Sequence, residues 1–510
     1  MICKRVPKYY QHTEKNGLPA MNNVSPETLE AEYVIIGSGA GGSAVADVLT
    51  RAGKDVLMLE EGPAIDKKII STDAAENMRR YWRDAGLTVA LGKNPINYAE
   101  GRCVGGGTEI NSGIFQRCDD KIIEDWSKKY QLDHFSPSHL STYYERAERA
   151  VNASDTLADA GPPTHRLIQG AETMGWEYVR LKRAQRDCMG TNFCAFSCPT
   201  GGKQSMSVTL LPQSQQRGLR LHSGLKALKL MRTGQKISSV IATNGVNNFI
   251  VKGKFFFACA GAVHTPSLLL KSGIRHNIGR GLQLHPTLKV TGLFHQAIHA
   301  DQHRLPLAAI THFMPEQRIG GSVFSPATYG LAMSESWSHR KHFLPEWGHA
   351  GSYYGMIKPE GCGRVVVLPG VARPLVTYHL TAQDWENLRQ ITARLCQLLF
   401  AAEAHTVLPS IHDHGGFDDA HTARAFLDAS LPKKHVNLMS VHMFSSCKPG
   451  QNKAQTATDS FGKVWDVDNL WVADASQIPG APGVNPQATI MALAYRNAES
   501  MLNGHHAKTF

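Results

Sequence analysis

The sequence predicts a mixed α/β protein, and three stretches carry that prediction. The first is residues 33–42, where a short apolar run ends in the pattern Gly-x-Gly-x-x-Gly. β-branched apolar runs of this length are typical of buried parallel strands. The other two are residues 100–113, which are dense in glycine, and residues 254–274, where an apolar run passes through small residues into a helical pattern.

The first stretch has the spacing of a dinucleotide-binding turn. Gly37 allows the tight turn after the strand, Gly39 lets a pyrophosphate approach the backbone, and Gly42 lets a helix pack on the strand. The helix N-terminus then faces the phosphates, and Ala40 in the same turn is a further expected contact. The glycine pattern alone is a weak signal, so the flanking elements decide its meaning.

The residues after the turn complete a strand–turn–helix–strand unit. Residues 44–51 alternate apolar and polar at helical spacing, and Gly53 ends that helix. Residues 56–60 then predict a second strand that closes on Glu60, whose carboxylate is expected to bind the ribose hydroxyls. We therefore predict a Rossmann-like dinucleotide-binding domain.

The composition indicates a large globular enzyme. A chain of 510 residues with 42% hydrophobic and 19% charged residues is too long for one simple core and unlike a disordered chain. The net charge is +11, but no run of five Lys or Arg occurs, so we expect no nucleic-acid partner. We expect no transmembrane segment and no secretory signal, hence a cytoplasmic protein or one exported with a partner subunit.

Residues 100–113 read Glu-Gly-Arg-Cys-Val-Gly-Gly-Gly-Thr-Glu-Ile-Asn-Ser-Gly. Consecutive glycines expose backbone N–H groups and let the chain lie flat against a ligand. Together with the opening turn, this block resembles the glucose–methanol–choline (GMC) oxidoreductase family, whose members are FAD enzymes that oxidise alcohols. The resemblance implies cofactor contacts from Arg102, Gly106 and Asn111.

Residues 254–274 are similar to a second signature of the same family. The resemblance implies that the Rossmann sheet is completed here and that Ala260 passes near the adenosine. The following segment, residues 281–286, also follows the family pattern. It contains His285, which we interpret as structural because it precedes a proline in a loop.

A cysteine-rich loop carries Cys188, Cys194 and Cys198. Thiolates are the ligands of iron–sulfur clusters, while the spacing does not suit a common zinc site. The loop resembles that of bacterial FAD-dependent sugar and gluconate dehydrogenases, which implies a three-iron, four-sulfur cluster held by these cysteines. Two alternatives remain open: three plain thiols in a loop, or the similar loop of long-chain alcohol oxidases, which has no established cluster role.

Residues 440–450 align with the family segment that bears the catalytic histidine, which implies that His442 is catalytic. Ser445 stands where the family usually has glycine. Further on, Asn485 is expected at the N-cap and Pro486 at the first position of a C-terminal helix. The resemblance implies that Asn485 also takes the second catalytic position and that both residues contact the cofactor.

The family chemistry assigns a role to each polar group. An imidazole titrates near neutrality, so His442 is expected to take the hydroxyl proton while hydride leaves the carbon for flavin N5. Asn485 cannot take a proton and is expected to orient the substrate oxygen. The resemblance also implies that Asp474 and Ala475, at the end of a strand, approach the cofactor.

These assignments predict a Rossmann-like FAD-binding domain interleaved with an antiparallel-sheet substrate domain. The FAD-binding domain is expected to be built from three separate segments, residues 30–120, 200–290 and 455–510. The other expected segments are a polar arm (1–29), a lid-like insertion with the cysteine loop (121–199) and the substrate-binding domain (291–454).

The resemblance implies FAD-dependent oxidation of an alcohol or sugar CH–OH group to a carbonyl. Electrons are expected to pass through the cluster to an acceptor protein or small subunit, which makes a dehydrogenase the first choice. Three alternatives remain open: an oxygen-using alcohol oxidase, a non-redox FAD-containing lyase and an electron-relay subunit. The wall over residues 291–440 carries no readable specificity code.

Overall fold

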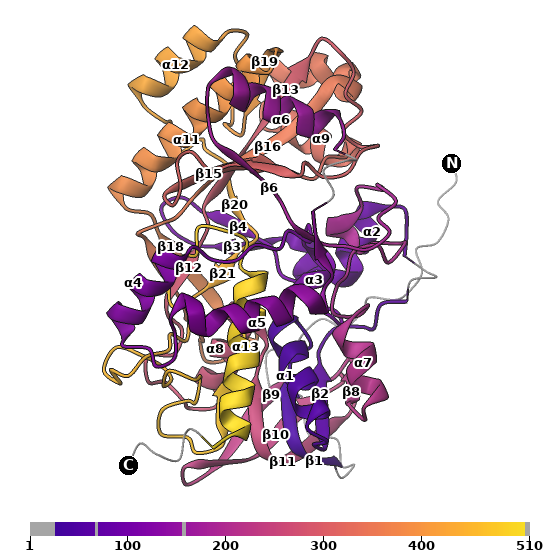
Figure 1. Ribbon diagram of the computed structural model, residues 1–510, viewed down its shortest axis with the longest axis vertical. Coiled ribbons are helices and arrows are strands. Elements are labelled where there is room, and N and C mark those ends of the chain that lie inside the picture. Colours follow the sequence, from indigo (N-terminus) through magenta and orange to yellow (C-terminus); the bar gives the residue numbers. More distant parts are fainter. Residues whose placement is uncertain (1–25, 67–69, 156–159, 505–510) are drawn as a thin grey trace.

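The computed structural model describes residues 26–66, 70–155 and 160–504. It shows two lobes, one above the other in Figure 1. The lower lobe contains both ends of the described chain, and the upper lobe is built from its middle. Most of the expected polar arm lies outside the described residues, and the described chain begins with strand β1 (Glu27–Ile36). No described helix is long and apolar enough to cross a membrane.

The lower lobe is organised around a seven-stranded sheet. Its order is β8 (Arg220–Ser223), β2 (Val56–Glu60), β1, β11 (Asn248–Ala258), β10 (Lys236–Thr243) and β9 (Lys226–Thr233), with β22 (Leu470–Val472) also paired to β11. The central strands are parallel, and β2 is buried at every position, which accounts for its four consecutive apolar residues before Glu60. This sheet confirms the Rossmann-like prediction.

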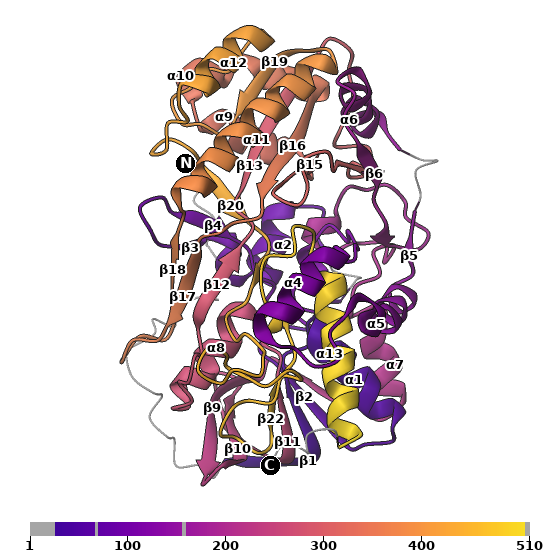
Figure 2. The ribbon, with the colours of Figure 1, turned by 60° about the vertical axis from the view of Figure 1, so that its left-hand side comes forward.

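Helices cover one face of this sheet and are joined by a buried aspartate. They are α1 (Ala40–Arg51), α5 (Pro137–Ala150), α7 (Leu210–Gln216) and α13 (Gln487–Leu502), seen together in Figures 1 and 2. Asp47 of α1 accepts hydrogen bonds from Arg51 at 2.8 Å, Arg146 at 2.9 Å and Arg217 at 2.6 Å. The Arg146 guanidinium also stacks 4.1 Å from the ring centre of Tyr495 on α13. The first and last helices are thereby held in one layer.

The upper lobe contains a nine-stranded, largely antiparallel sheet. Its order is β3 (Thr88–Ala90), β4 (Ile96–Tyr98), β20 (Leu438–Ser440), β13 (Thr287–Phe294), β16 (Ala350–Ile357), β15 (Gln317–Gly321), β14 (Ala308–Ile310) and β6 (Tyr178–Arg180), with β19 (Ala404–Pro409) paired to β13. Strands β3 and β4 come from the N-terminal portion of the chain, so the two lobes are interleaved in sequence.

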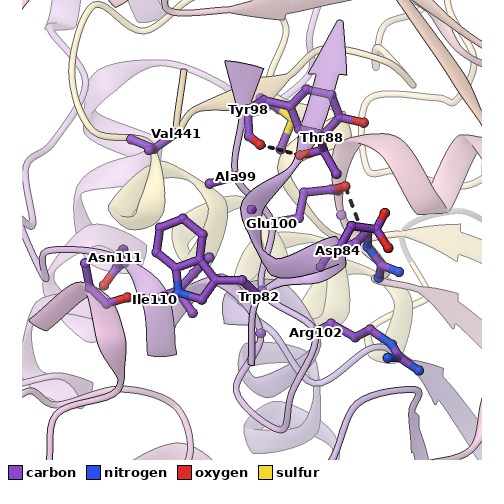
Figure 3. A pocket seen from close by; sticks show the side chains of 18 of the residues that line it. Trp82, Asp84, Thr88, Tyr98, Ala99, Glu100, Arg102, Ile110, Asn111 and Val441 are labelled. Atoms are coloured by element: carbon purple, nitrogen blue, oxygen red, sulfur yellow. Dashed lines mark hydrogen bonds and ion pairs between the residues drawn. The ribbon is translucent and has the colours of Figure 1, made fainter. Parts of the chain in front are cut away.

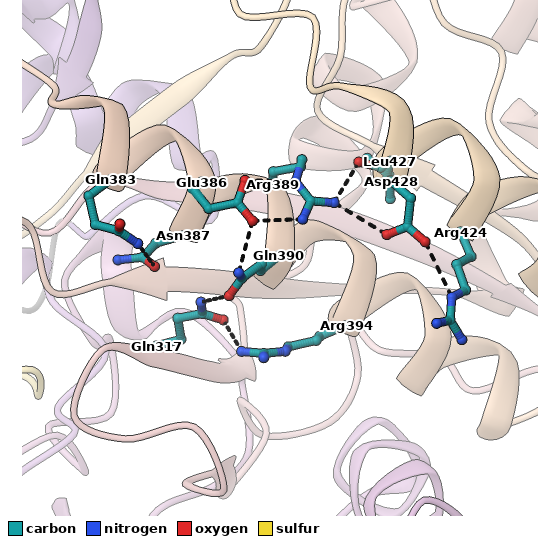
Figure 4. A network of polar contacts seen from close by, with 10 residues as sticks. All are labelled: Gln317, Gln383, Glu386, Asn387, Arg389, Gln390, Arg394, Arg424, Leu427 and Asp428. Atoms are coloured by element: carbon teal, nitrogen blue, oxygen red, sulfur yellow. Dashed lines mark hydrogen bonds and ion pairs between the residues drawn. The ribbon is translucent and has the colours of Figure 1, made fainter.

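Helix α11 (Ala382–Ala401) is fastened to this sheet by the polar network in Figure 4. Arg394 donates to Gln317 of β15 at 2.6 Å, and Gln317 donates to Gln390 at 3.0 Å. On the other side, Arg389 contacts Asp428 of α12 (Ala420–Ala429) at 3.2 Å. Two helices and a strand are thus linked through one row of side chains.

A four-stranded sheet joins the lobes and brings two histidines together. Its order is β18 (Leu375–His379), β17 (Cys362–Val366), β12 (Arg280–Leu284) and β21 (Met443–Phe444). Leu284 pairs with Met443, so His285 directly after β12 lies beside His442 directly before β21.

The remaining elements are shorter or lie at the edges of the lobes. They are α2 (Ala74–Tyr81), a 3-10 turn (Arg83–Gly86), α3 (Gly107–Ile110), α4 (Asp120–Tyr130), β5 (Ala153–Ser154), α6 (Pro162–Thr173), β7 (Arg183–Ala184), a 3-10 turn (Cys194–Phe196), α8 (Gly261–Lys271), α9 (Pro326–Ser334), α10 (Trp337–Arg340), a 3-10 segment (Lys341–His349) and a 3-10 turn (Ala475–Gln477).

Candidate active site

A cavity of about 2040 Å³ is lined by residues of both lobes. Sites for one small ligand usually measure about 300–1,000 Å³, so this cavity has room for a dinucleotide and a second molecule. Every residue expected at the cofactor or catalytic site lines it, except Gly42. Figure 3 shows one region of it, with Trp82 standing between Asn111 and Arg102.

The glycine turn is shaped for a ligand that lies on the backbone. Gly37 has φ +107°, and a Cβ there would lie 2.3 Å from the Cys259 carbonyl oxygen. A Cβ on Gly42 would lie 2.0 Å from the Gly37 carbonyl oxygen, so Gly42 serves helix packing as predicted. A Cβ on Gly39 would meet no atom of the described residues within 4 Å, which leaves open space at the start of α1. The helix begins at Ala40, earlier than expected, because the turn glycines already form its first turn.

Glu60 is held in place by Ser38, a residue that sequence reasoning missed. Ser38 donates to its Oε2 from the backbone at 3.1 Å and from Oγ at 2.6 Å, and Gly62 N–H donates to Oε1 at 2.8 Å. Ser38 Oγ also accepts from Gly105 N–H at 3.0 Å, which joins the turn to the second glycine block. The serine between the first two glycines was the available signal.

The second glycine block lies against the first. A Cβ on Gly106 would lie 3.0 Å from Gly39 Cα, so the two backbones are in close contact. Asn111 donates to Gln487 Oε1 at 2.6 Å and accepts from Gly113 N–H at 3.0 Å. The block is therefore fixed both to the turn and to the start of α13.

Asp474 is a buried carboxylate surrounded by donors. It accepts from Gly261 N–H at 2.8 Å, from Thr265 Oγ1 at 2.5 Å, and from Ser476 N–H at 2.9 Å. Burial raises its pKa, and these hydrogen bonds oppose that rise. Asp474, in the turn after β22, thereby holds the turn after β11 beside its own turn. Ala260 of the turn after β11 and Ala475 of the turn after β22 both line the cavity.

The two expected catalytic residues are in contact. Asn485 Nδ2 lies 3.1 Å from His442 Nε2, and the other ring nitrogen of His442 lies 3.0 Å from His285 Nδ1. His285 is fully buried, and Gly483 N–H donates to its Nε2 at 3.3 Å. His285 is thus a direct partner of His442, which the sequence interpretation of a structural loop histidine did not anticipate.

The contact with Gly483 favours one arrangement of protons. Because the Gly483 N–H can only donate, His285 Nε2 must be the acceptor and carries no proton. Neutral His285 therefore has its proton on Nδ1 and donates it to His442 Nδ1. Neutral His442 then carries its proton on Nε2, facing Asn485. A half-turn of the Asn485 amide would supply an acceptor and would also pair Asn485 Oδ1, which is buried and has no hydrogen-bond partner among the described residues. In the opposite tautomer, Asn485 Nδ2 donates to a free lone pair on His442 Nε2.

The expectation that His442 titrates near neutrality is wrong. Burial lowers its pKa to about 3, and the positive charge of Arg318 acts in the same direction. His285 is shifted the same way, chiefly by burial, with its pKa well below the ordinary value. Both imidazoles are therefore neutral at pH 7.

The expected cap of the C-terminal helix is also wrong. Pro486 is the N-cap of α13 and no side chain caps the helix, because the Asn485 side chain is turned toward His442. Ser445, which stands where the family usually has glycine, has a φ of +68°, in the region that favours glycine, and its Oγ donates to the Ile478 carbonyl at 2.7 Å.

The cysteine loop does not form the expected metal site. Cys188, Cys194 and Cys198 line one cavity of only about 10 Å³, the size of a single water site. Across the described segments, no three His, Cys, Asp or Glu side chains are grouped to hold a metal ion. As placed, these residues do not fit an iron–sulfur cluster.

The loop is instead anchored to the cofactor block by a buried lysine. Lys203 Nζ donates to the carbonyl oxygens of Glu109 at 2.7 Å, Asn111 at 2.9 Å and Cys194 at 2.6 Å. Trp82 Nε1 donates to Ala195 at 3.0 Å. The loop therefore belongs to the cavity wall beside the second glycine block.

The fold and this cavity define a class of protein: a dinucleotide-binding protein with two histidines in contact at its cavity. The GMC oxidoreductase family models match residues 31–287 and 369–494. The chain belongs to the GMC oxidoreductase family and is an FAD-dependent oxidoreductase.

Similar proteins extend over nearly the whole chain. A protein named uncharacterized GMC-type oxidoreductase from Sinorhizobium fredii is 51% identical, over 93% of this chain and 95% of its own. A long-chain-alcohol oxidase of Arabidopsis thaliana is 26% identical, over 94% of this chain and 68% of its own. The crystal structure of pyridoxine 4-oxidase from Mesorbium loti matches with a TM-score of 0.72 at 16% identity, over 94% of this chain and 100% of that structure.

Proposed function

We propose that the protein oxidises an alcohol CH–OH group to a carbonyl with FAD as hydride acceptor. The observation that carries the proposal is the contact of His442 with Asn485 in the cavity that also contains the glycine turn. Relatives whose names include alcohol oxidase support the choice of substrate class.

The residues around the cavity fit FAD. The open space at Gly39, the fixed Glu60 carboxylate and the N-terminus of α1 suit a pyrophosphate and a ribose. When bound, FAD supplies the acceptor for the hydride. The protein's own contribution is to bind the alcohol, orient its C–H bond and remove the hydroxyl proton.

His442 is the proposed base, through Nε2. To act as the base, His442 must have its lone pair on Nε2 and its proton on Nδ1, which then donates to His285 Nδ1. His285 must in turn carry its proton on Nε2, so it can no longer accept the hydrogen bond from Gly483 N–H. A hydrogen bond contributes about 0.5–1.5 kcal/mol, so this tautomer is accessible from the resting one. The low pKa keeps the lone pair available at pH 7 and weakens the driving force for accepting a proton.

Asn485 is proposed to position the substrate oxygen. Its amide already lies against Nε2, so a hydroxyl placed between the two side chains contacts both. A carboxamide does not titrate, so its contribution is orientation.

The electron acceptor is proposed to be a partner protein, a small subunit or a quinone, so that the enzyme acts as a dehydrogenase. The resemblance to sugar dehydrogenases supports this choice, and no step is assigned to an iron–sulfur cluster. Measured oxygen consumption and dye reduction during turnover separate a dehydrogenase from an oxidase.

A separate measurement tests for a cluster: iron and acid-labile sulfide are determined in anaerobically purified protein. Amounts that correspond to about one cluster per chain would show that the cysteine loop rearranges to bind one.

The test of the main proposal is anaerobic bleaching of the bound flavin. The purified yellow protein is mixed under argon with a panel of alcohols, and the flavin absorbance is followed. Reduction by an alcohol, with the carbonyl product recovered, supports the proposal. Conversion of a substrate without bleaching would identify a lyase, and bleaching only by a reduced partner would identify a relay subunit.

A further inference from the structure

Strand β13 forms one wall of the cavity. Thr287, Lys289 and Thr291 line the cavity, whereas the intervening Leu288 and Val290 are buried in the core of the upper lobe. This alternation follows from the two-residue period of a strand. Lys289 therefore presents an ammonium group from the middle of the wall.

The neighbouring strand adds hydroxyl groups to this wall. In the register of β16, Tyr354 pairs with Lys289 and Ser352 pairs with Thr291, and both line the cavity. Ser410 lies beside them, since its N–H donates to the Lys289 carbonyl at 2.9 Å. The surroundings of the ammonium are polar and suit a ligand rich in oxygen.

Glu335 is the acidic residue whose charge acts on the Lys289 ammonium, and its carboxylate already has other partners. Glu335 accepts from Asn437 Nδ2 at 2.7 Å, and its other oxygen lies 3.3 Å from Arg340 Nη1. Arg340 is fully buried, and it carries the charge that balances Glu335.

The side-chain ammonium of Lys289 has no hydrogen bond or ion pair to any residue in the described portion of the chain. Burial lowers its pKa, and Glu335 opposes this effect. A partly buried ammonium without a partner is costly, and an anion would compensate it. The wall thus contains one more positive charge than its own residues neutralise.

We propose that the substrate is an alcohol that also carries an anionic group, most simply a hydroxycarboxylic acid, and that Lys289 binds this group. The proposal rests on the proposed function and specifies its substrate class. The hydroxyl to be oxidised lies at His442 and Asn485, and the carboxylate lies along β13 at Lys289. The hydroxyls of Thr291, Ser352 and Tyr354 would contact further oxygens of the same molecule.

The strand sets the approximate length of such a substrate. Thr287 is tied to the histidine pair, because its Oγ1 donates to the His285 carbonyl at 2.9 Å. Lys289 lies two residues farther along the same face, a rise of about 7 Å. Alcohol and anionic groups separated by several bonds can therefore reach both ends at once, whereas the shortest hydroxy acids cannot.

The experiment compares matched substrates on the holoenzyme. Anaerobic flavin reduction is measured with ω-hydroxycarboxylates of increasing length, the α,ω-diols of the same length and the corresponding ω-amino alcohols. The expected result is a preference of about tenfold or more in kcat/KM for the hydroxy acid over the diol, with a length optimum. Equal rates for acid and diol, or a preference for the amino alcohol, would overturn the proposal.

Variants then assign the preference to the residue. Lys289→Met, which keeps the length of the side chain, should lower the preference about tenfold or more, mainly by raising KM for the hydroxy acid, and should affect the diol much less. Lys289→Arg should retain a preference for the acid. Lys252→Met removes an exposed lysine of β11 that pairs with Glu30 of β1 and does not line the cavity, and it should change neither rate. A preference that survives in Lys289→Met would contradict the assignment.

A binding measurement separates this proposal from the proposed function. Simple carboxylates and neutral alcohols of equal length are titrated calorimetrically into the oxidised holoenzyme and into Lys289→Met. If no alcohol reduces the flavin while carboxylates bind only with Lys289 present, the proposed reaction fails and the anion site stands. If alcohols reduce the flavin while carboxylates bind both proteins equally, the reaction stands and the anion site fails.

Discussion

The glycine turn and the β13–β16 wall lie on the same cavity but are specified in different ways. The turn acts through its backbone: Gly37 and Gly42 are required because any Cβ would collide with a carbonyl oxygen. The wall presents side chains that alternate along a strand, such as Lys289. The shape of the turn is therefore set by its backbone, whereas the proposed selection of the substrate depends on side chains of the wall.

The sharpest test of this contrast is a pair of glycine substitutions. Gly37→Ala should yield protein without bound flavin, because the added Cβ meets the Cys259 carbonyl and the backbone has positive φ. Gly39→Ala should fold normally and only weaken FAD binding, since its Cβ meets no atom of the described residues. Visible absorbance and circular dichroism of the purified variants measure both effects. Equal flavin content in the two variants would contradict the distinction.

The next largest effect is expected at the catalytic pair. His442→Ala should keep bound FAD and lower anaerobic flavin reduction by about two to four orders of magnitude, because the base is lost. Stopped-flow absorbance measures the rate. Unchanged reduction kinetics would exclude His442 as the base.

A smaller loss is expected from the partner histidine. His285→Leu leaves His442 Nδ1 buried without a partner, which should slow flavin reduction about five- to a hundredfold at unchanged flavin content. His285→Asn offers an acceptor to His442 Nδ1 and should recover some of the rate. If both variants react at the rate of the unmodified protein, the contact is only structural.

The pH dependence distinguishes a buried base from an exposed one. The base works in its neutral form, so flavin reduction is lost as pH falls through the pKa of His442, which is about 3. The reduction rate should therefore stay level from neutral pH down to about pH 4 in rapid pH-jump mixing. A fall centred near pH 6.5, the ordinary value for histidine, would show that the pair is hydrated in the working enzyme.

The smallest effect is expected far from the cavity. Arg424→Met removes the contact of Arg424 with Asp428 on α12, which is an exposed ion pair. Such pairs contribute about 0–1 kcal/mol, so the midpoint of thermal unfolding should fall by about 1 °C or less with catalysis unchanged. Differential scanning calorimetry with matched activity assays measures this. A large loss of activity would show that the network in Figure 4 also supports the wall.

The sequence was most informative where the constraint is local. Gly37 and Gly39 of the turn, Glu60 at the end of its strand and Asn111 of the glycine block all line one cavity. These motifs are recognisable in the sequence because a few consecutive residues must adopt one particular backbone conformation, which restricts the residue types at those positions.

It was least informative where distant segments meet. His285 and His442 are 157 residues apart and are brought together only by the pairing of β12 with β21. Their low pKa values follow from burial that no local pattern records. The orientation of Asn485 was misjudged for the same reason, because a capping role is visible in the sequence and a distant imidazole is not.

The pairing of β22 with β11 has a consequence for how the protein is made. The cofactor sheet begins at Glu27 and receives its last strand only at Leu470–Val472. A growing chain on the ribosome cannot complete the flavin pocket until almost all of it has been synthesised. Contacts so distant in sequence also slow folding. Flavin is therefore captured at the end of biosynthesis, and chains terminated before Leu470 should emerge colourless and depend on chaperones.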